Sequence, residues 1–165
     1  MKFDTAVEYI LDLEGGYVFD SNDPGGETKY GISKRSFPHL HIKNLSRDQA
    51  KDIYREYYWQ KMQCEVLPGY LRLMVFDCAV NQGVARSARL LQASVGAEVD
   101  GQIGTKTLKK AQDGEPIDVL TSFSAKRHQS YAKNPRWKFY GAGWSKRLLE
   151  ISLLCAFLVA KEKAK

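Results

Sequence analysis

The sequence lacks an uninterrupted apolar run long enough to cross a bilayer. Its most apolar stretch, Leu148 to Ala160, is broken only by Glu150 and Ser152, and it falls short of the about 20 residues that a spanning helix needs. The first residues place acidic side chains inside an apolar pattern, which differs from the apolar core of a signal peptide. We therefore expect synthesis in a cytoplasm, with no signal peptide and no transmembrane span.

Cysteine is scarce, and the chain contains only Cys64, Cys78 and Cys155. These residues are far apart and have no histidine partners at metal-ligand spacing, which argues against a zinc site or a disulfide framework. We expect buried thiols. The sequence also has no internal repeat, low-complexity tract or long linker. A chain of 165 residues can bury a core, and a single domain over residues 1–165 is predicted.

Basic residues are concentrated in the second half of the chain. Residues 1–82 contain 10 Lys and Arg against 12 Asp and Glu, whereas residues 83–165 contain 15 against 7. A basic half indicates contact with a polyanion, which could be nucleic acid, anionic lipid or cell wall. The basic residues are scattered without a recognition motif, so nucleic acid is not the expected partner.

The pattern of apolar residues predicts a mainly helical α+β fold. Helical spacing from Phe3 to Leu11 predicts a first helix that ends at Gly15-Gly16 and carries Glu14 at its C-terminal end. Turn-forming residues over 17–33 indicate a loop or a small β-hairpin. A capping box at Ser46 begins a predicted helix that runs to Tyr58, and two more helices are predicted over about 70–82 and 84–95. A turn at 100–104 precedes a short helix with Thr105 as the cap of that helix. The last two helices are predicted from Pro116 to about Tyr131 and from Ser145 to Lys165, with a loop over 133–144 between them.

The stretch from Glu14 to Thr28 contains the residue types that glycoside hydrolysis requires. A carboxyl group at a helix C-terminus, near aromatic residues, is favoured in its protonated form, as a general acid must be. Asp23 lies in a glycine-flanked turn where a carboxylate stays ionised, and the Thr28 hydroxyl could hold a water. Asp20 and Glu27 are also available. A solvated helix end followed by an ordinary turn would explain the same spacing.

A second group of polar residues suggests a binding groove. Tyr30 and Gly31 end the loop where a sugar could lie, although Tyr30 could equally belong to the hairpin core. Asp77, Asn81 and Gln82 interrupt an apolar helix, and leaving them buried without partners would cost about 1–3 kcal/mol each. Asp77 and Asn81 are four residues apart and share a helix face, which suits contact with sugar hydroxyls. The alternative is an internal polar network.

Several motifs resemble one enzyme family. The segment "EGGYVFDSNDPGGETKYGISKRSFP" resembles the opening motif of the glycoside hydrolase family 108 muramidases, phage endolysins with a lysozyme-like fold. The similarity continues through "YREYYWQ", "VFDCAVNQG" and "LLQASVG". "DGQIGTKTL" is similar to an element of a peptidoglycan-binding region, which suggests a helical subregion of that kind over 85–165, although we favour a purely structural role for this turn.

The resemblance implies that Glu14 is the catalytic acid, with Asp23 and Thr28 in the order seen in phage-type lysozymes. The expected reaction is hydrolysis of the β-1,4 bond between N-acetylmuramic acid and N-acetylglucosamine in peptidoglycan, with no metal or organic cofactor. A lytic transglycosylase acting on the same bond and a non-catalytic wall-binding module are the alternatives.

The resemblance also implies the partner of the chain and the compartment in which it acts. Peptidoglycan is the expected partner, and the protein would stay in the host cytoplasm until lysis and then reach the periplasm and cell wall. We expect a monomer. The apolar C-terminal helix, with lysines and arginines at its ends, is more typical of a buried helix, but it could also disturb an anionic outer membrane.

Overall fold

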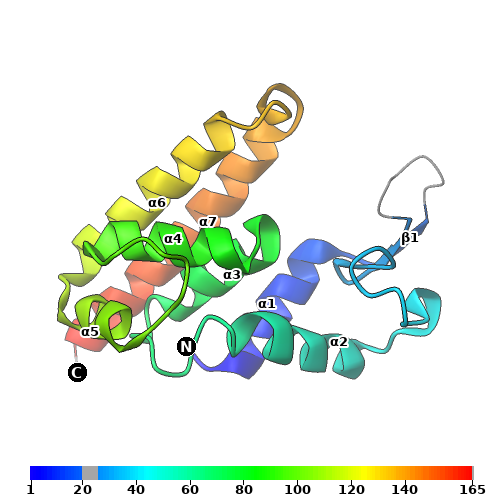
Figure 1. Ribbon diagram of the computed structural model, residues 1–165, viewed down its shortest axis with the longest axis horizontal. Coiled ribbons are helices and arrows are strands. Elements are labelled where there is room, and N and C mark those ends of the chain that lie inside the picture. Colours follow the sequence, from blue (N-terminus) through cyan, green and yellow to red (C-terminus); the bar gives the residue numbers. More distant parts are fainter. Residues whose placement is uncertain (20–25, 165) are drawn as a thin grey trace. The chain divides into compact units, whose positions relative to one another are not determined.

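The structure is a computed structural model that describes residues 1–19 and 26–164. It divides into two compact units, which we call the N-terminal unit (residues 2–57) and the C-terminal unit (Met1 with residues 58–165). Figure 1 shows that helices dominate both of them. None of the helices in the described part of the chain is long and apolar enough to span a bilayer.

The N-terminal unit consists of two helices and a small antiparallel sheet. Helix α1 (Phe3–Glu14) buries one apolar face, and Gly15 ends it with a positive φ of 76°. Three strands follow in the order β1 (Tyr17–Phe19), β2 (Glu27–Lys29) and β3 (Ile32–Ser33). A 3-10 turn η1 (Ile42–Asn44) leads to helix α2 (Arg47–Tyr54), which continues as a π-helical turn η2 (Arg55–Trp59). The predicted mainly α fold with a small β element is confirmed.

Charged side chains join α1 to α2. The Arg47 guanidinium lies 2.5 Å from Glu8 Oε2 and 2.8 Å from Asp12 Oδ1, and Lys51 Nζ lies 2.6 Å from Glu8 Oε1. Hydrogen bonds from Lys51 and Arg47 lower the pKa of Glu8. At the start of α2 the predicted capping box is present, because the Ser46 side chain accepts from the Gln49 N–H and the Gln49 side chain accepts from the Ser46 N–H. These contacts fix the helix that carries Tyr54.

In the described residues of the C-terminal unit there are five α-helices, one of which, α3 (Arg72–Gln82), is largely buried. Helix α3 has seven consecutive buried residues from Leu73 to Ala79. It is followed by α4 (Val84–Val95), α5 (Thr105–Asp113), α6 (Pro116–Ala132) and α7 (Trp137–Lys163). Helices α6 and α7 lie side by side, as Figure 1 shows. All three cysteines are buried and free, as predicted.

Two predictions about this unit were wrong. Residues 137–144 are not a loop but the first two turns of α7. The two glycines there fit a helix because Gly141 packs on the indole of Trp137, where a Cβ atom would lie 2.7 Å from Cδ2. Thr105 is not a cap either, because the N-cap position belongs to Gly104 and no side chain caps the helix.

Candidate functional site

Glu14 ends α1 and lies against the turn between β2 and β3. That turn consists of Tyr30 and Gly31, and both have positive φ angles, 53° and 74°. Two residues in this conformation make a tight hairpin turn, which glycine adopts without strain but tyrosine does not. A Cβ atom on Gly31 would lie 2.9 Å from Cγ and from Oε2 of Glu14. Glycine is therefore required at position 31 both for the turn and for the approach of the Glu14 carboxyl group.

Tyr54 holds this turn from α2. Its hydroxyl donates a 2.7 Å hydrogen bond to the Tyr30 carbonyl, and a Cβ atom on Gly31 would come within 2.7 Å of the same hydroxyl. The Tyr54 side chain is buried, whereas Glu14 is half-buried. The helix predicted from Ser46 to Tyr58 contains Tyr54, whose side chain was given no role. Its helical spacing indicated burial, but no local pattern could show that its hydroxyl meets a turn 24 residues away.

The other residues predicted for the hairpin are placed as follows. Thr28 lies in the middle of β2, half-buried, and pairs with Val18 of β1 and Ser33 of β3. Glu27 accepts a 3.1 Å hydrogen bond from the Tyr17 hydroxyl, and the Lys29 ammonium donates to the Lys43 carbonyl. Asp23 and Asp20 lie outside the described residues. The structure therefore brings Glu14, Tyr30 and Gly31 together.

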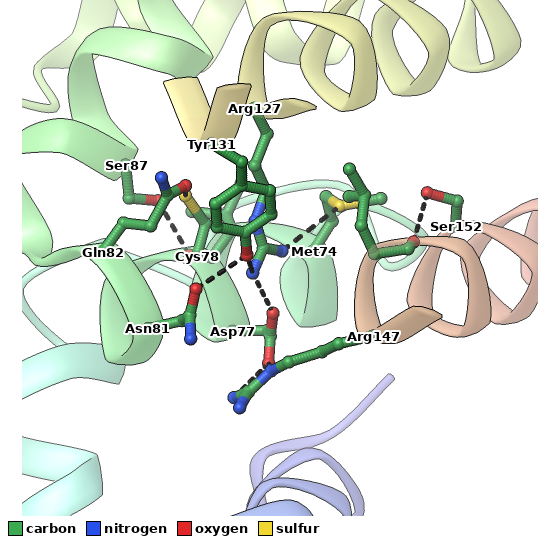
Figure 2. A network of polar contacts seen from close by, with 12 residues as sticks. Met74, Asp77, Cys78, Asn81, Gln82, Ser87, Arg127, Tyr131, Arg147 and Ser152 are labelled. Atoms are coloured by element: carbon green, nitrogen blue, oxygen red, sulfur yellow. Dashed lines mark hydrogen bonds and ion pairs between the residues drawn. The ribbon is translucent and has the colours of Figure 1, made fainter. Parts of the chain in front are cut away.

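Asp77 lies at the centre of a polar network in the C-terminal unit, shown in Figure 2. Its side chain has no exposed surface. Arg127 of α6 donates to Oδ2 at 2.5 Å, and Arg147 of α7 donates to Oδ1 at 2.8 Å. Burial by itself lowers the pKa of Arg127, but the Asp77 carboxylate and other neighbours raise it overall, so the guanidinium stays charged. Asp77 thus occupies an internal network, the alternative that the sequence left open, and its carboxylate is covered by arginines.

Asn81 and Gln82 extend this network towards a surface pocket. The Tyr131 hydroxyl donates to Asn81 Oδ1 at 2.7 Å and accepts from Arg127 at 2.8 Å. Gln82 donates to the Ser130 hydroxyl at 3.1 Å. Both amides are half-buried and line a pocket of about 220 Å³, together with Arg86, Tyr131, Asn134 and Trp144. These two residues therefore reach a space where a ligand could contact them.

The arginines of this network were not predicted as site residues. Arg127 and Arg147 lie 50 and 70 residues from Asp77 along the chain. A buried aspartate signals that some cation must meet it, but the sequence does not show which one. In the described part of the chain, no group of three or more His, Cys, Asp or Glu residues is placed to hold a metal ion.

Two comparisons with known proteins found similarities. A family profile described as Glycosyl hydrolase 108 matches residues 7–83, which include Glu14, the hairpin, α2 and α3. The structure of Brucella abortus SagA is similar along nearly the whole length: the alignment has 30% identity, covers 93% of this chain and 93% of that chain, and gives a TM-score of 0.86. No curated protein matches the chain.

The chain belongs to glycosyl hydrolase family 108. As a member of a glycoside hydrolase family it is an enzyme, and membership implies peptidoglycan-degrading activity. Within this family 108 chain, the profile includes both Glu14 at the end of α1 and the polar residues of α3. The similarity to SagA extends further, through the remaining helices of the C-terminal unit.

Proposed function

We propose that this chain is an endolysin muramidase that hydrolyses the β-1,4 bond between N-acetylmuramic acid and N-acetylglucosamine. The observation that carries the proposal is the position of Glu14, at the end of α1 and within contact distance of the Gly31 backbone. A sugar polymer can approach a carboxyl group closely where the neighbouring residue has no side chain. Membership of a glycoside hydrolase family supports the same assignment.

In this mechanism Glu14 donates a proton to the glycosidic oxygen as the bond breaks. Positive charge develops at the sugar carbon, and a second carboxylate must stabilise it or orient the attacking water. We assign this role to Asp23, with the Thr28 hydroxyl positioning the water. Tyr30 and Gly31 would contact the sugar beside Glu14. Asn81 and Gln82 would contact the substrate in their own pocket of the C-terminal unit. The chain's own carboxyl groups supply the acid and the base, and no cofactor takes part in this scheme.

The masses of the products test the reaction type. A hydrolase adds water across the bond and leaves reducing muramic acid ends, whereas a lytic transglycosylase lets the sugar's own hydroxyl attack and leaves anhydro ends. Purified peptidoglycan digested with the protein should give fragments that carry the mass of one added water. Anhydro-muramic ends would replace the proposal with the transglycosylase. A folded protein that releases no fragments would favour a wall-binding module.

A membrane contact is a second candidate, favoured by one face of α7. Leu148, Ile151, Cys155 and Val159 are buried, but Leu149, Leu153 and Phe157 are 62%, 71% and 63% exposed. These three recur every four residues and so form one stripe, with the exposed ammonium groups of Lys146 and Lys161 nearby on the helix. An apolar stripe with basic residues suits anionic lipid. Vesicles with anionic headgroups should bind the protein, and the triple change of the stripe to serine should abolish that binding.

A further inference from the structure

Four basic side chains converge on a pocket between α4 and α6. The pocket has a volume of about 580 Å³, and Arg86, Arg89, Lys126 and Lys133 line it. We call it the basic pocket. Its other lining residues are apolar or neutral polar, and no acidic side chain is among them. The pocket lies entirely within the C-terminal unit.

These four cations are not neutralised by the protein. None of them forms an ion pair with a carboxylate in the described part of the chain. Lys126 donates to the Ser122 hydroxyl at 2.9 Å, which leaves its charge uncompensated. Like charges repel by about 1 kcal/mol at 4 Å even in water. A bound anion would relieve this repulsion, whereas a neutral ligand would not.

Arg89 lies against the turn that precedes α5. Its guanidinium lies over Gly101, where a Cβ atom would come within 3.2 Å of Cζ, and Gly101 has a φ of 86°. The neighbouring Asp100 is occupied elsewhere, because it accepts from the Gln92 amide at 2.6 Å and from the Gln102 N–H at 2.8 Å. These hydrogen bonds lower the pKa of Asp100, and the charge of Arg89 adds a smaller effect. Arg89 therefore lies against this turn, and no ion pair joins it to Asp100 in the described part of the chain.

The basic pocket continues into the smaller pocket formed by Asn81 and Gln82. The two pockets share Arg86 and Asn134. In the smaller pocket the ring of Trp144 stacks on Tyr131 with centroids 5.2 Å apart, and the amides supply donors and acceptors. Amides and an aromatic ring suit an uncharged polar group, and arginine forks suit carboxylates. A ligand that carries both would occupy both pockets.

We propose that the basic pocket binds the carboxylates of the peptide stems of peptidoglycan. This inference rests on the proposed function, because the stem is attached to the muramic acid whose bond would be cleaved. The stem carries carboxylates on its D-glutamyl, diaminopimelyl and terminal residues, together with uncharged amides. Charge complementarity of this kind increases both the association rate and the selectivity of binding.

A substrate pair tests the inference. The first substrate is intact peptidoglycan, and the second is glycan strands from which an amidase has removed the stems. The variant Arg86→Gln/Arg89→Gln/Lys133→Gln should raise KM about tenfold or more on intact peptidoglycan, since about 1.4 kcal/mol corresponds to a factor of ten. It should leave kcat/KM on stripped strands unchanged. A control with the same charge change outside the pocket, Lys61→Gln/Lys106→Gln/Lys138→Gln, should behave like the wild type on both.

Binding of the free stem peptide separates this inference from the proposed function. Calorimetric titration of L-Ala-D-Glu-diaminopimelate-D-Ala into the wild type should show binding that the pocket variant loses and the control keeps. If the wild type cleaves neither substrate, the proposed function fails and this titration alone decides the inference. An unchanged KM in the pocket variant, or an equal loss on both substrates, would overturn it. Displacement of the stem peptide by a short DNA duplex at lower concentration would overturn it in favour of nucleic acid.

Discussion

Gly31 is the residue whose identity the geometry of the site restricts most. A Cβ atom at this position would meet both the Tyr54 hydroxyl, at 2.7 Å, and the Glu14 carboxyl group, at 2.9 Å, which leaves no room for it. Its φ of 74° is also unfavourable for any other residue. Sequence and structure agree here on different grounds, since the sequence indicated a turn and the structure shows the contact.

Replacing Gly31 by alanine should therefore reduce activity more than it reduces stability. The new methyl group would displace the Glu14 carboxyl group, which the proposed mechanism requires in place, and we expect kcat to fall at least about tenfold. Gly26 provides the matched control, because it has a similar φ of 65° but no atom of the described residues within 4 Å of its Cβ position. Gly26→Ala should show the cost of the backbone conformation alone. Equal kcat values for the two variants would contradict the steric explanation.

Asp77 is the residue on which the polar network of the C-terminal unit depends. Asp77→Asn would leave the buried Arg127 without its counter-charge, and breaking a buried pair in this way costs about 3–5 kcal/mol. The free energy of unfolding, measured in urea, should fall by that amount. Asp113→Asn removes an exposed pair with Lys109, at 2.8 Å, and should cost less than about 1 kcal/mol. Similar losses for both variants would show that the network contributes little.

Among the helices and strands, local signals predicted most helices, but they misplaced the cap of α5 and missed the start of α7. The capping box at Ser46, the proline at the start of α6 and the glycines after α3 and α4 each define a boundary from neighbouring residues alone. The start of α7 has no such signal. Gly141 and Gly143 weaken a helical pattern, and the contact that compensates, Gly141 against Trp137, becomes visible only once the helix exists.

The two glycines at the start of α7 should respond differently to substitution by alanine. A Cβ atom on Gly141 would lie 2.7–2.9 Å from three atoms of the Trp137 ring, whereas one on Gly143 would meet nothing within 4 Å. Gly141→Ala should lower the thermal midpoint because the ring must move. Gly143→Ala should raise the free energy of unfolding by about 0.5–1 kcal/mol, as alanine replaces glycine in a helix. A stabilising effect of both changes would contradict the packing seen at Trp137.

The candidate site was predictable only in part, and the limit is sequence separation. Glu14 was identified from a helix end and the motif that follows it, all within a few residues. Tyr54 and Arg127 act through contacts across 24 and 50 residues. Residues of α4 and α6 line the basic pocket together. The sequence shows only that the second half of the chain is rich in lysine and arginine. Asp23 remains a prediction, since it lies outside the described residues.

Among the larger features of the molecule, the three thiols, all in the C-terminal unit, report on the unfolding of that unit. Burial raises the pKa of the Cys64 and Cys78 thiols and raises that of Cys155 to about 12. A thiol whose pKa is raised stays protonated and unreactive at neutral pH. At pH 8 the native protein should react slowly with a disulfide reagent, and all three thiols should react at once in denaturant. Fast labelling of one thiol in the native protein would show that part of the core opens locally.

The substitution Glu14→Gln tests the account most directly, with activity measured as release of soluble fragments from purified peptidoglycan. Glutamine keeps the shape of the side chain but cannot donate the proton, so activity should fall at least about a hundredfold while the thermal midpoint stays close to that of the wild type. Glu27→Gln, a carboxyl change on the neighbouring hairpin, should keep most of the activity. Full activity of the folded Glu14→Gln protein would contradict the account.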